Sequence, residues 1–347
     1  MRIIYSGVRN EHYVLQRGKS FEYNNFYLAL KNMPDIEVIE YPFDAIVAQG
    51  RRVFNDNLLE LVRKERPDLV FCFMYTDELD PRVLMEIKKY TKTIAWFADD
   101  YWRFWNYSRR WAPYFSSVVT TSHEAFEWYH AEGHRNVILS QWACNTALYA
   151  PRDVSRRDID VSFIGQYKPV RAAIIKTLSR AGIRVEAFGF GWPNGRVSQD
   201  RMLDIFSRSK INLNLNVRPH LWEPRILARL FLKKSITRLV PDFHFLDNFS
   251  AYRHVVLPHI HARPFELAGC GAFVISGYAA GIENYYVPDT EMVFYRSHEE
   301  LIEKINYYLS HDEGRERIAR AGYERTLRDH TYERRFEKIF NIIHALK

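Results

Sequence analysis

Short apolar runs alternate with longer amphipathic stretches along the first 150 residues. Runs that are continuous in β-branched and aromatic residues predict strands buried on both faces. Such runs are Arg2–Tyr5, Ile36–Tyr41, Asp68–Met74, Thr93–Phe97, Ser117–Thr121 and Asn136–Ser140. Stretches with a helical period lie between them, at about 21–32, 51–65, 81–90 and 122–132. Alternating strands and helices predict a parallel sheet with right-handed crossovers.

The polar segment Ala150–Asp158 interrupts this alternation and predicts a linker. The alternation then restarts with strands at Asp160–Ile164, Arg184–Phe188, Ile211–Leu215, Ala272–Ser276 and Met292–Tyr295. Helical patterns cover Pro169–Ala181 and about 298–309, 312–328 and 332–345. We therefore expect an α/β protein with an N-terminal domain, 1–150, and a C-terminal domain, 151–330, that carries an irregular or helical insertion at about 218–258. Residues 331–347 are expected to form a C-terminal helix that packs back toward the N-terminal domain.

Charge separates the two halves of the chain. The 347 residues hold 49 Lys+Arg and 42 Asp+Glu, a formal net charge of +7. Residues 1–150 hold 18 basic and 19 acidic side chains, so the remaining 31 and 23 give residues 151–347 a net charge of +8. A basic domain beside a nearly neutral one indicates that one domain binds an anion. Because no helix-turn-helix, RNP or zinc-finger pattern is present, a compact phosphate ligand fits better than nucleic acid.

Cysteine usage and hydropathy favour a protein of the reducing cytosol. Cys72, Cys144 and Cys270 form no close pair, and their odd number does not fit a disulfide framework. The longest uncharged stretch, Leu267–Ile282, has only 16 residues, four of them glycines, so it does not fit a membrane span. We expect a cytoplasmic protein, either free or peripheral at the inner face of the membrane.

The turn that opens the first helix of the second half suits a diphosphate. Gly165 and Gln166 follow a strand end, and Pro169 opens the helix. The free N–H groups and the dipole of a helix start favour an anion. Lys168 and Arg171 lie within one turn of that start, where they can offset charge on a leaving group. The alternative is two solvated cations.

Glycines at three further strand ends allow a ligand to approach the backbone. They are Gly7 after the first strand, Gly189 with Trp192 after 184–188, and Gly281 with Ile282 and Glu283 after 272–276. Trp192 offers a flat ring for a nucleobase, and Glu283 is placed to reach a bound hydroxyl. Ordinary turns and a packed tryptophan are the alternatives. No G-x-G-x-x-G follows the first strand, which argues against a dinucleotide cofactor.

Carboxylates at two positions can take part in the chemistry. Glu266 follows Arg263 at the start of a short helix, where it can accept hydrogen bonds from a sugar diol or simply complement the helix dipole. Asp99 and Asp100 follow a buried strand, where they can handle an acceptor hydroxyl or a proton, or serve as a helix cap.

Histidines cluster only at His254, His259 and His261, and no cysteine or acidic residue has metal-site spacing around them. The chain also lacks the Walker and G-x-S-x-G motifs. We therefore expect neither a metal nor a resident cofactor.

The segment Arg225–Val240 is basic and can be interpreted as an amphipathic helix. Arg225, Arg229 and Lys233 would share one face at i, i+4 and i+8. That face either contacts an anionic membrane or is simply solvated.

Three stretches together resemble the GT-B glycosyltransferases of the "glycosyl transferases group 1" class, and more narrowly the CgeB-like spore-maturation group. They are DVSFIGQYKPVRAAII at 160–175, the segment at 261–309 that begins HARPFELAGCGAFVIS, and DEGRERIARAGYERTLRDHTYERR at 312–335. Weaker likeness comes from TIAWFADDYWRF at 93–104 and INLNLN at 211–216.

The resemblance implies two Rossmann-like domains whose parallel sheets face each other across a cleft that holds a nucleotide-sugar, with a UDP-sugar favoured. It implies that Glu266 holds the ribose, that Ala279–Glu283 meets the diphosphate and the sugar, and that Lys168 and Arg171 face the diphosphate. The sugar would pass to a glycan, a lipid-linked acceptor or another hydroxyl, with retention of configuration and without a metal.

One position departs from the pattern of this class. Pro258 stands where many group 1 enzymes carry a second glutamate, eight residues before the helix glutamate. A non-catalytic nucleotide-sugar or glycan-binding protein on the same scaffold is therefore the alternative. Nucleic-acid binding has only the basic charge and the aromatic content in its favour.

Overall fold

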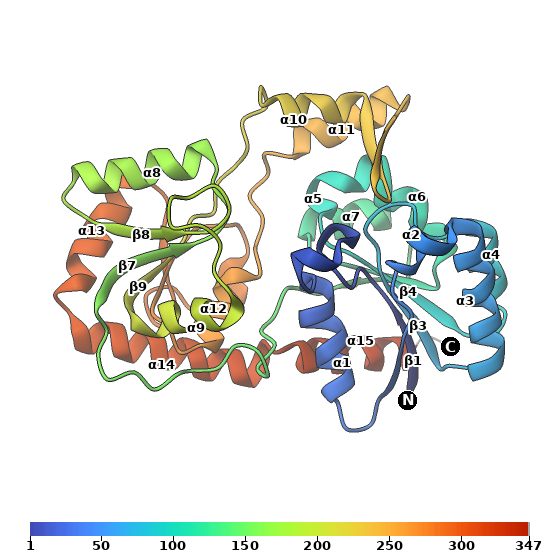
Figure 1. Cartoon of the computed structure of the whole chain (residues 1–347), viewed down its shortest axis with the longest axis horizontal. Coiled ribbons are helices and arrows are strands. Elements are labelled where there is room, and N and C mark those ends of the chain that lie inside the picture. Colours follow the sequence, from blue (N-terminus) through green and yellow to red (C-terminus); the bar gives the residue numbers. More distant parts are fainter. Residues whose placement is uncertain (346–347) are drawn as a thin grey trace. The chain divides into compact units, whose positions relative to one another are not determined.

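The computed structural model describes residues 1–345, which form two compact units (Figure 1). Unit 1 contains residues 1–141, 219–257 and those from Arg335 onward, and unit 2 contains residues 142–218 and 258–334. The segment that we expected as an insertion in the C-terminal domain thus belongs to unit 1. Among the described residues, no helix combines the length and the apolar character needed to cross a bilayer.

Unit 1 is built on a six-stranded parallel sheet with the order β2-β1-β3-β4-β5-β6. Its strands are β1 Arg2–Ser6, β2 Glu37–Glu40, β3 Leu69–Phe73, β4 Lys92–Phe97, β5 Ser117–Thr120 and β6 Val137–Leu139. Every residue of β3 is buried, as expected for a central strand covered on both faces. The strands predicted for this half are confirmed, with small shifts at their ends.

The helices of unit 1 connect and cover these strands. They are α1 Leu28–Asn32 with a π-helical turn at Tyr23–Tyr27, α2 Ala45–Gln49, α3 Arg51–Glu65, α4 Pro81–Ile87, α5 Asp100–Arg103, a π-helical turn at Phe104–Ser108, α6 Arg109–Trp111 and α7 His123–Ala131. Asp80 caps α4 and Ser122 caps α7, each with its side chain accepting from a main-chain N–H of the first turn.

The C-terminal helix α15, Tyr332–Ala345, joins the core of unit 1 from Arg335 onward. The ring of Phe336 lies 5.7 Å from that of Phe26 and 5.9 Å from that of Phe71, between ring centroids. Lys92 Nζ donates to the carbonyl of Ile343 at 2.8 Å. These contacts bury an apolar stripe of α15 against the β1–β3–β4 part of the sheet.

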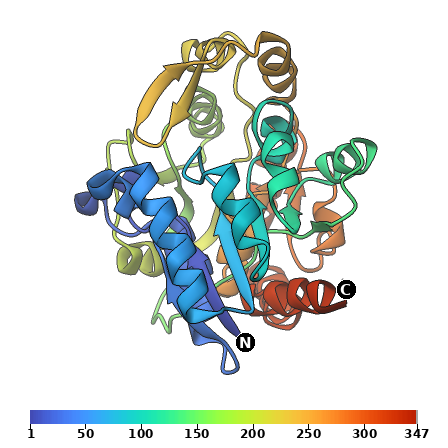
Figure 2. The ribbon, with the colours of Figure 1, turned by 90° about the vertical axis from the view of Figure 1, so that its right-hand side faces the viewer.

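The insertion of unit 1 contains a β-hairpin instead of the helix predicted over 225–240, so that prediction is wrong. Its elements are α10 Pro224–Leu227, a 3-10 turn at Ala228–Leu230, β10 Leu232–Ser235, β11 Arg238–Pro241 and α11 Phe245–His254 (Figure 2). Ile236 adopts a positive φ of 50° in the two-residue turn between the strands. A β-branched residue takes this conformation only when its surroundings enforce it.

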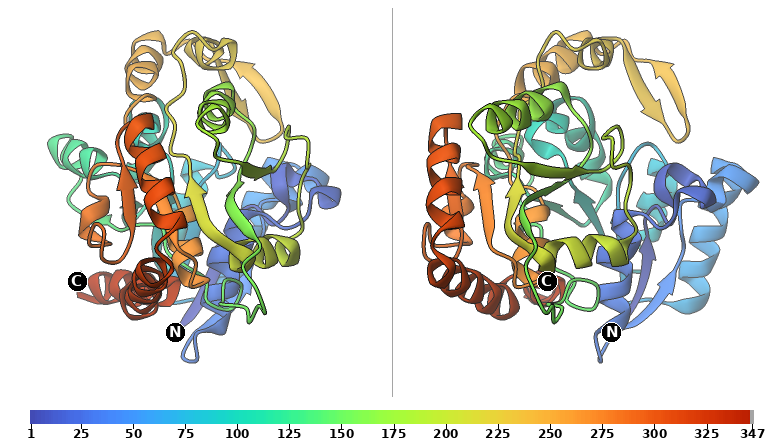
Figure 3. Two further views of the ribbon diagram at one scale, coloured as in Figure 1. Left: turned by 90° about the vertical axis from the view of Figure 1, so that its left-hand side faces the viewer. Right: turned by 60° about the vertical axis from the view of Figure 1, so that its left-hand side comes forward.

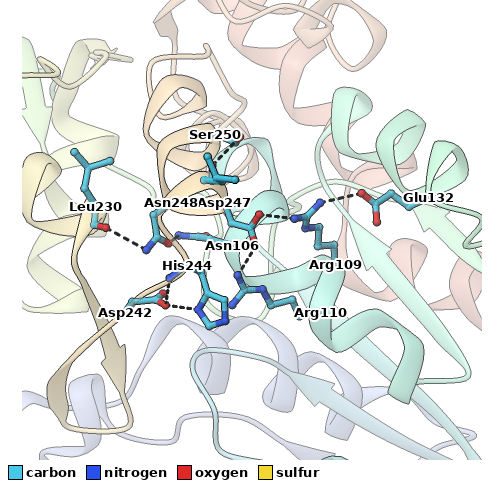
Figure 4. A network of polar contacts seen from close by, with 11 residues as sticks. Asn106, Arg109, Arg110, Glu132, Leu230, Asp242, His244, Asp247, Asn248 and Ser250 are labelled. Carbon is cyan, nitrogen blue, oxygen red and sulfur yellow. Dashed lines mark hydrogen bonds and ion pairs between the residues drawn. The ribbon is translucent and has the colours of Figure 1, made fainter.

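Contacts with the rest of unit 1 enforce this turn. Thr76 Oγ1 accepts from the Ile236 main-chain N–H at 3.0 Å, and Ser235 Oγ donates to Asp77 Oδ2 at 2.9 Å. Farther along, Asn106 donates to the Asn248 side chain at 3.0 Å, and Asp247 forms ion pairs with Arg109 and Arg110 (Figure 4). The insertion therefore rests on unit 1 through polar contacts.

Unit 2 has a five-stranded parallel sheet with the order β13-β12-β9-β7-β8. Its strands are β7 Ile159–Ile164, β8 Val185–Phe188, β9 Ser209–Asn214, β12 Val274–Gly277 and β13 Val293–Tyr295. Its helices are α8 Pro169–Arg180, α9 Gln199–Arg208, α12 Arg263–Gly269, α13 His298–Leu309 and α14 Asp312–Asp329. The strands predicted for the second half are confirmed.

Helices lie on both sides of this sheet (Figure 3), and two separate apolar clusters fill its two faces. Ile174 of α8 and Leu301 of α13 belong to one cluster, and Phe206 of α9 and Phe265 of α12 belong to the other. The sheet is thus covered on both faces, which leaves the ends of its strands as the positions where a ligand can reach the chain.

Replacing Asp247 by Ala is expected to loosen the insertion, because it leaves Arg109 and Arg110 without a shared carboxylate. We expect unfolding free energy to fall by about 1–3 kcal/mol, the range for hydrogen bonds to charged groups, and proteolysis within 219–257 to become faster. Urea unfolding and limited proteolysis measure the two effects. Asp56→Ala is the matched control, because its pairing with Arg52 is exposed and 3.9 Å long. Equal effects of the two substitutions would contradict this account.

Candidate functional site

The turn between β7 and α8 in unit 2 is held by a close approach of two glycines. Gly189 has a φ of 129°, and a Cβ there would overlap the carbonyl oxygen of Gly165. Trp192 Nε1 donates to that same carbonyl at 2.9 Å, while the indole packs edge-on against Phe163 and Tyr167. The structure therefore gives Trp192 a part in shaping the turn, and its contact with a nucleobase stays a prediction.

Arg171 lies just above this turn, in the first part of α8. Its Nη1 donates to the Gln166 carbonyl at 2.9 Å and its Nε to the Leu215 carbonyl at 3.3 Å. No ion pair joins it to a carboxylate within the described part of the chain. Burial, followed by the nearby charge of Arg263, lowers the pKa of Arg171 to about 10, so the guanidinium is still charged at neutral pH.

Further cationic and imidazole groups surround Arg171. Lys168 occupies the N-cap position of α8 in an extended conformation, and no side chain caps the helix there. The rings of His259 and His261 lie 4.2 Å apart. Burial, then His259, Arg171 and Lys168, lower the pKa of His261 well below its usual range, so its imidazole is neutral at neutral pH. We call Lys168, Arg171, His259, His261 and Arg263 the cationic cluster.

The amino-acid pattern alone does not connect the two histidines with this site. In the sequence, His259 and His261 stand out only as candidate metal ligands, and among residues 1–345 no three His, Cys, Asp or Glu side chains are grouped as a metal site requires. The signal that would have found them is their position directly before Arg263, on the chain that leads to α12.

Glu266 lies in the first turn of α12 and is buried. Its Oε2 forms an ion pair with Arg263 Nη1 at 2.8 Å. Burial, then the charge of Glu266, raise the pKa of Tyr149 well above its usual range. Glu266 thus anchors the arginine that neighbours Arg171, while its contact with a ribose stays a prediction.

The loop after β12 has the small residues that close approach requires. Gly281 has a φ of 84° and precedes a short 3-10 turn, Ile282–Asn284. Glu283 is exposed and accepts a hydrogen bond from Tyr278 at 2.9 Å, and the guanidinium carbon of Arg296 lies 3.4 Å from the Tyr278 ring centroid. The donor-binding role of this loop stays a prediction.

The other predicted residues belong to unit 1. Gly7 follows β1, where its carbonyl accepts from the Phe43 N–H at 3.0 Å. Asp100 is 1% exposed and accepts hydrogen bonds from Ser108 and Tyr129. Its neighbour Asp99 instead lines a cavity. The geometry makes Asp100 a positioning residue within unit 1, and direct chemistry by its carboxylate stays untested.

This cavity lies wholly within unit 1 and has a volume of about 620 Å³. The loop after β3, the helices from α5 to α6 and the hairpin line it, among others with Tyr75, Trp102, Tyr107, Trp111, Arg229 and Lys234. The guanidinium carbon of Arg229 lies 4.1 Å from the Trp102 ring centroid, and that of Arg103 lies 3.9 Å from the Tyr107 ring. No ion pair joins these two arginines to a carboxylate within the described residues.

Aromatic rings, together with cations that form no ion pair among the described residues, are suited to a polar ligand that carries flat apolar faces and anionic groups. A sugar or glycan has such faces where its C–H groups lie on one side of the ring. The lining of this cavity therefore differs in chemistry from the cationic cluster of unit 2.

Comparison with known proteins places part of the chain in a known sequence family. Residues 237–341 match a family model described as glycosyl transferase-like. A search of curated proteins by sequence finds no match.

Solved structures align with the whole chain. Sucrose-phosphate synthase from Thermosynechococcus elongatus aligns with a TM-score of 0.60 at 13% identity, over 100% of this chain and 99% of its own. HepE from Anabaena, solved with UDP and glucose, aligns with a TM-score of 0.59 at 11% identity. The alignment covers 99% of this chain and 100% of HepE. The lipopolysaccharide outer core galactosyltransferase WaaB aligns with a TM-score of 0.58 at 11% identity, over the full length of both chains.

The chain therefore has the GT-B fold of two Rossmann-like units, as the sequence predicts. The resemblance to GT-B glycosyltransferases is confirmed by the family match and by these structures. The narrower likeness to the CgeB-like group stays a prediction.

The buried Asp100 predicts a pH-dependent stability. Burial raises its pKa to about 7, against the opposing effect of its hydrogen bonds, whereas the unfolded value is about 3.9. The folded protein thus binds the proton of the Asp100 carboxyl more tightly than the unfolded chain does. The stability that this proton contributes is lost as the pH rises from about 4 to about 7, by at most about 1.4 kcal/mol per pH unit.

The Asp100→Asn variant lacks this proton. Urea unfolding at about pH 5 and about pH 8 should show the variant gaining stability relative to the wild type at the higher pH. Subtracting the two curves removes the contribution of other titrating groups. A difference that does not change with pH would contradict the raised pKa.

Proposed function

We propose that this protein is a glycosyltransferase that transfers a sugar from a nucleotide-sugar, a UDP-sugar, to a hydroxyl group of a carbohydrate or lipid-linked acceptor. The observation that carries the proposal is the cationic cluster near the carboxyl end of β7, where no carboxylate of the described residues forms an ion pair with Arg171. A diphosphate supplies the missing negative charge. The choice of UDP rests on HepE, which was solved with UDP and glucose in one structure and with UDP-glucose in another.

The proposed donor site lies in unit 2. The diphosphate binds at the start of α8, where main-chain N–H groups and the helix dipole add to the charges of Lys168 and Arg171. Because the bond between the anomeric carbon and the β-phosphate oxygen breaks toward the phosphate, negative charge grows on that oxygen. Arg171 stabilises this charge in the transition state, which lowers the barrier. The sugar of the donor is proposed to lie beside Gly281 and Glu283.

The acceptor is proposed to bind in the cavity of unit 1. Its sugar rings pack against Trp102 and Trp111, and its anionic groups face Arg103 and Arg229. Asp99 is the carboxylate of this cavity that can accept the proton of the attacking hydroxyl. The transfer is proposed to retain configuration and to need no metal, because the cationic cluster already supplies positive charge for the leaving diphosphate.

A non-catalytic binding protein is the second candidate. Pro258 in place of a second glutamate favours it, because one of the side chains that contact the sugar in many related enzymes is then missing. Binding of UDP-sugars without release of UDP, in the presence of a range of glycan acceptors, would support this candidate.

The proposal predicts that Arg171→Ala weakens recognition of the diphosphate. A ligand at about 100 times its dissociation constant stabilises a protein by about 2.7 kcal/mol, so UDP should raise the melting temperature of the wild type without added metal. Arg171→Ala should weaken UDP binding at least about tenfold, or about 1.4 kcal/mol, and slow UDP release from the donor. It should not lower the melting temperature of the free protein, since it removes a half-buried charge without a counter-ion.

Arg180→Ala is the matched control, since Arg180 is an exposed arginine in the last turn of the same helix. It should bind UDP and turn over donor like the wild type. Full turnover and full UDP affinity in Arg171→Ala would overturn the proposed donor site.

A further inference from the structure

Helix α11 of the insertion has its polar side turned inward and its apolar side turned outward. Asp247 and Asn248 face unit 1, where they contact Arg109, Arg110 and Asn106 (Figure 4). Phe245, Leu246 and Phe249 share the opposite side at i, i+1 and i+4 and are exposed, Leu246 to 84%. A surface helix of a globular protein ordinarily has the reverse arrangement.

Other exposed apolar side chains extend this side of the helix. Phe231 and Phe243 precede α11, and their ring centroids lie 6.0 and 6.3 Å from that of Phe245. Phe243 is 77% exposed. We define the α11 face as Phe231, Phe243, Phe245, Leu246 and Phe249. Exposed aromatic rings that lie next to one another in this way mark an interaction surface. On the surface of a soluble monomer, exposed apolar residues ordinarily occur singly.

The charges around the α11 face are basic. Lys233 and Arg238 are exposed on the neighbouring hairpin, and no acidic residue lies between Pro224 and Pro241. The acids closest in sequence to the face are both engaged, since Asp242 contacts His244 and Asp247 pairs with the two arginines of α6. The exposed surface of the insertion therefore combines apolar rings with an excess of basic side chains.

We propose that the α11 face docks on an anionic membrane surface. Rings of phenylalanine together with leucine enter the boundary between headgroups and acyl chains, and basic residues beside them attract anionic lipids. Trp222, which is 82% exposed at the start of the insertion, suits the interfacial layer that tryptophan favours. The inward polar contacts explain why α11 stays attached to unit 1 while its apolar side remains free for the lipid.

The full chain is to be tested by co-sedimentation with vesicles of phosphatidylcholine alone and with about 30% phosphatidylglycerol, in low and in high salt. The wild type should bind the anionic vesicles, and more weakly at high salt, because salt screens the basic residues. The triple variant Phe243→Ser, Leu246→Ser, Phe249→Ser should lose at least about tenfold in binding, since it removes most of the area that enters the lipid. The double variant Lys233→Glu, Arg238→Glu should bind the anionic vesicles more weakly than the wild type does. Its binding to vesicles of phosphatidylcholine alone should not change.

The matched control is the triple variant Leu15→Ser, Val47→Ser, Met85→Ser, which changes exposed apolar residues elsewhere in unit 1. It should bind vesicles like the wild type. All variants alter exposed side chains, so unchanged melting temperatures verify that each is folded.

Two results would overturn the proposal. One is a wild type that does not bind anionic vesicles, or a triple variant of the α11 face that binds them as well as the wild type does. The other is a dimer in lipid-free sedimentation that the same triple variant abolishes, since a second copy of the chain would then cover this face.

Discussion

The contact between two glycine backbones positions the end of unit 2 where we propose that the diphosphate binds. Gly189 lies so close to the Gly165 carbonyl that no side chain fits between them, and Trp192 donates to the same carbonyl. The turn held in this way presents the Gln166 carbonyl to Arg171, whose Nη1 donates to it at 2.9 Å. Backbone packing therefore decides where the guanidinium lies, and a residue with a Cβ at position 189 would displace the whole turn.

Both units contain arginines that form no ion pair with a carboxylate of residues 1–345. In unit 2, burial and Arg263 act against the charge of Arg171, and its lowered pKa expresses that cost. In unit 1, Arg229 and Arg103 lie over the rings of Trp102 and Tyr107, a position that holds a cation in place while leaving it able to meet an anion. Such charges are unfavourable in the free protein and become favourable when an anionic ligand binds. The insertion supplies one wall of the cavity in unit 1 and also carries the α11 face.

The sequence predicts the two sheets well because most of their strands contain a short apolar run bounded by polar residues. It does not predict the hairpin, because the basic residues of 225–240 also fit a helical spacing, and the deciding contacts come from Thr76 and Asp77, far away in the chain. The same holds for His259 and His261, which lie far from Arg171 in the sequence but close to it in the structure. Asp99 and Asp100 look alike in sequence, but the direction in which α5 starts buries one and places the other in the cavity. Local pattern thus determined the scaffold, while the site depends on long-range contacts.

Calorimetric titration of the full chain with UDP, UMP and uridine tests the central claim, that the cationic cluster recognises a diphosphate. The account predicts that UDP binds at least about tenfold more tightly than UMP, a difference of about 1.4 kcal/mol, and that uridine binds more weakly still. The difference should shrink as salt is raised, because it arises from charge. Equal affinity for all three ligands, or no binding of UDP, would contradict the account.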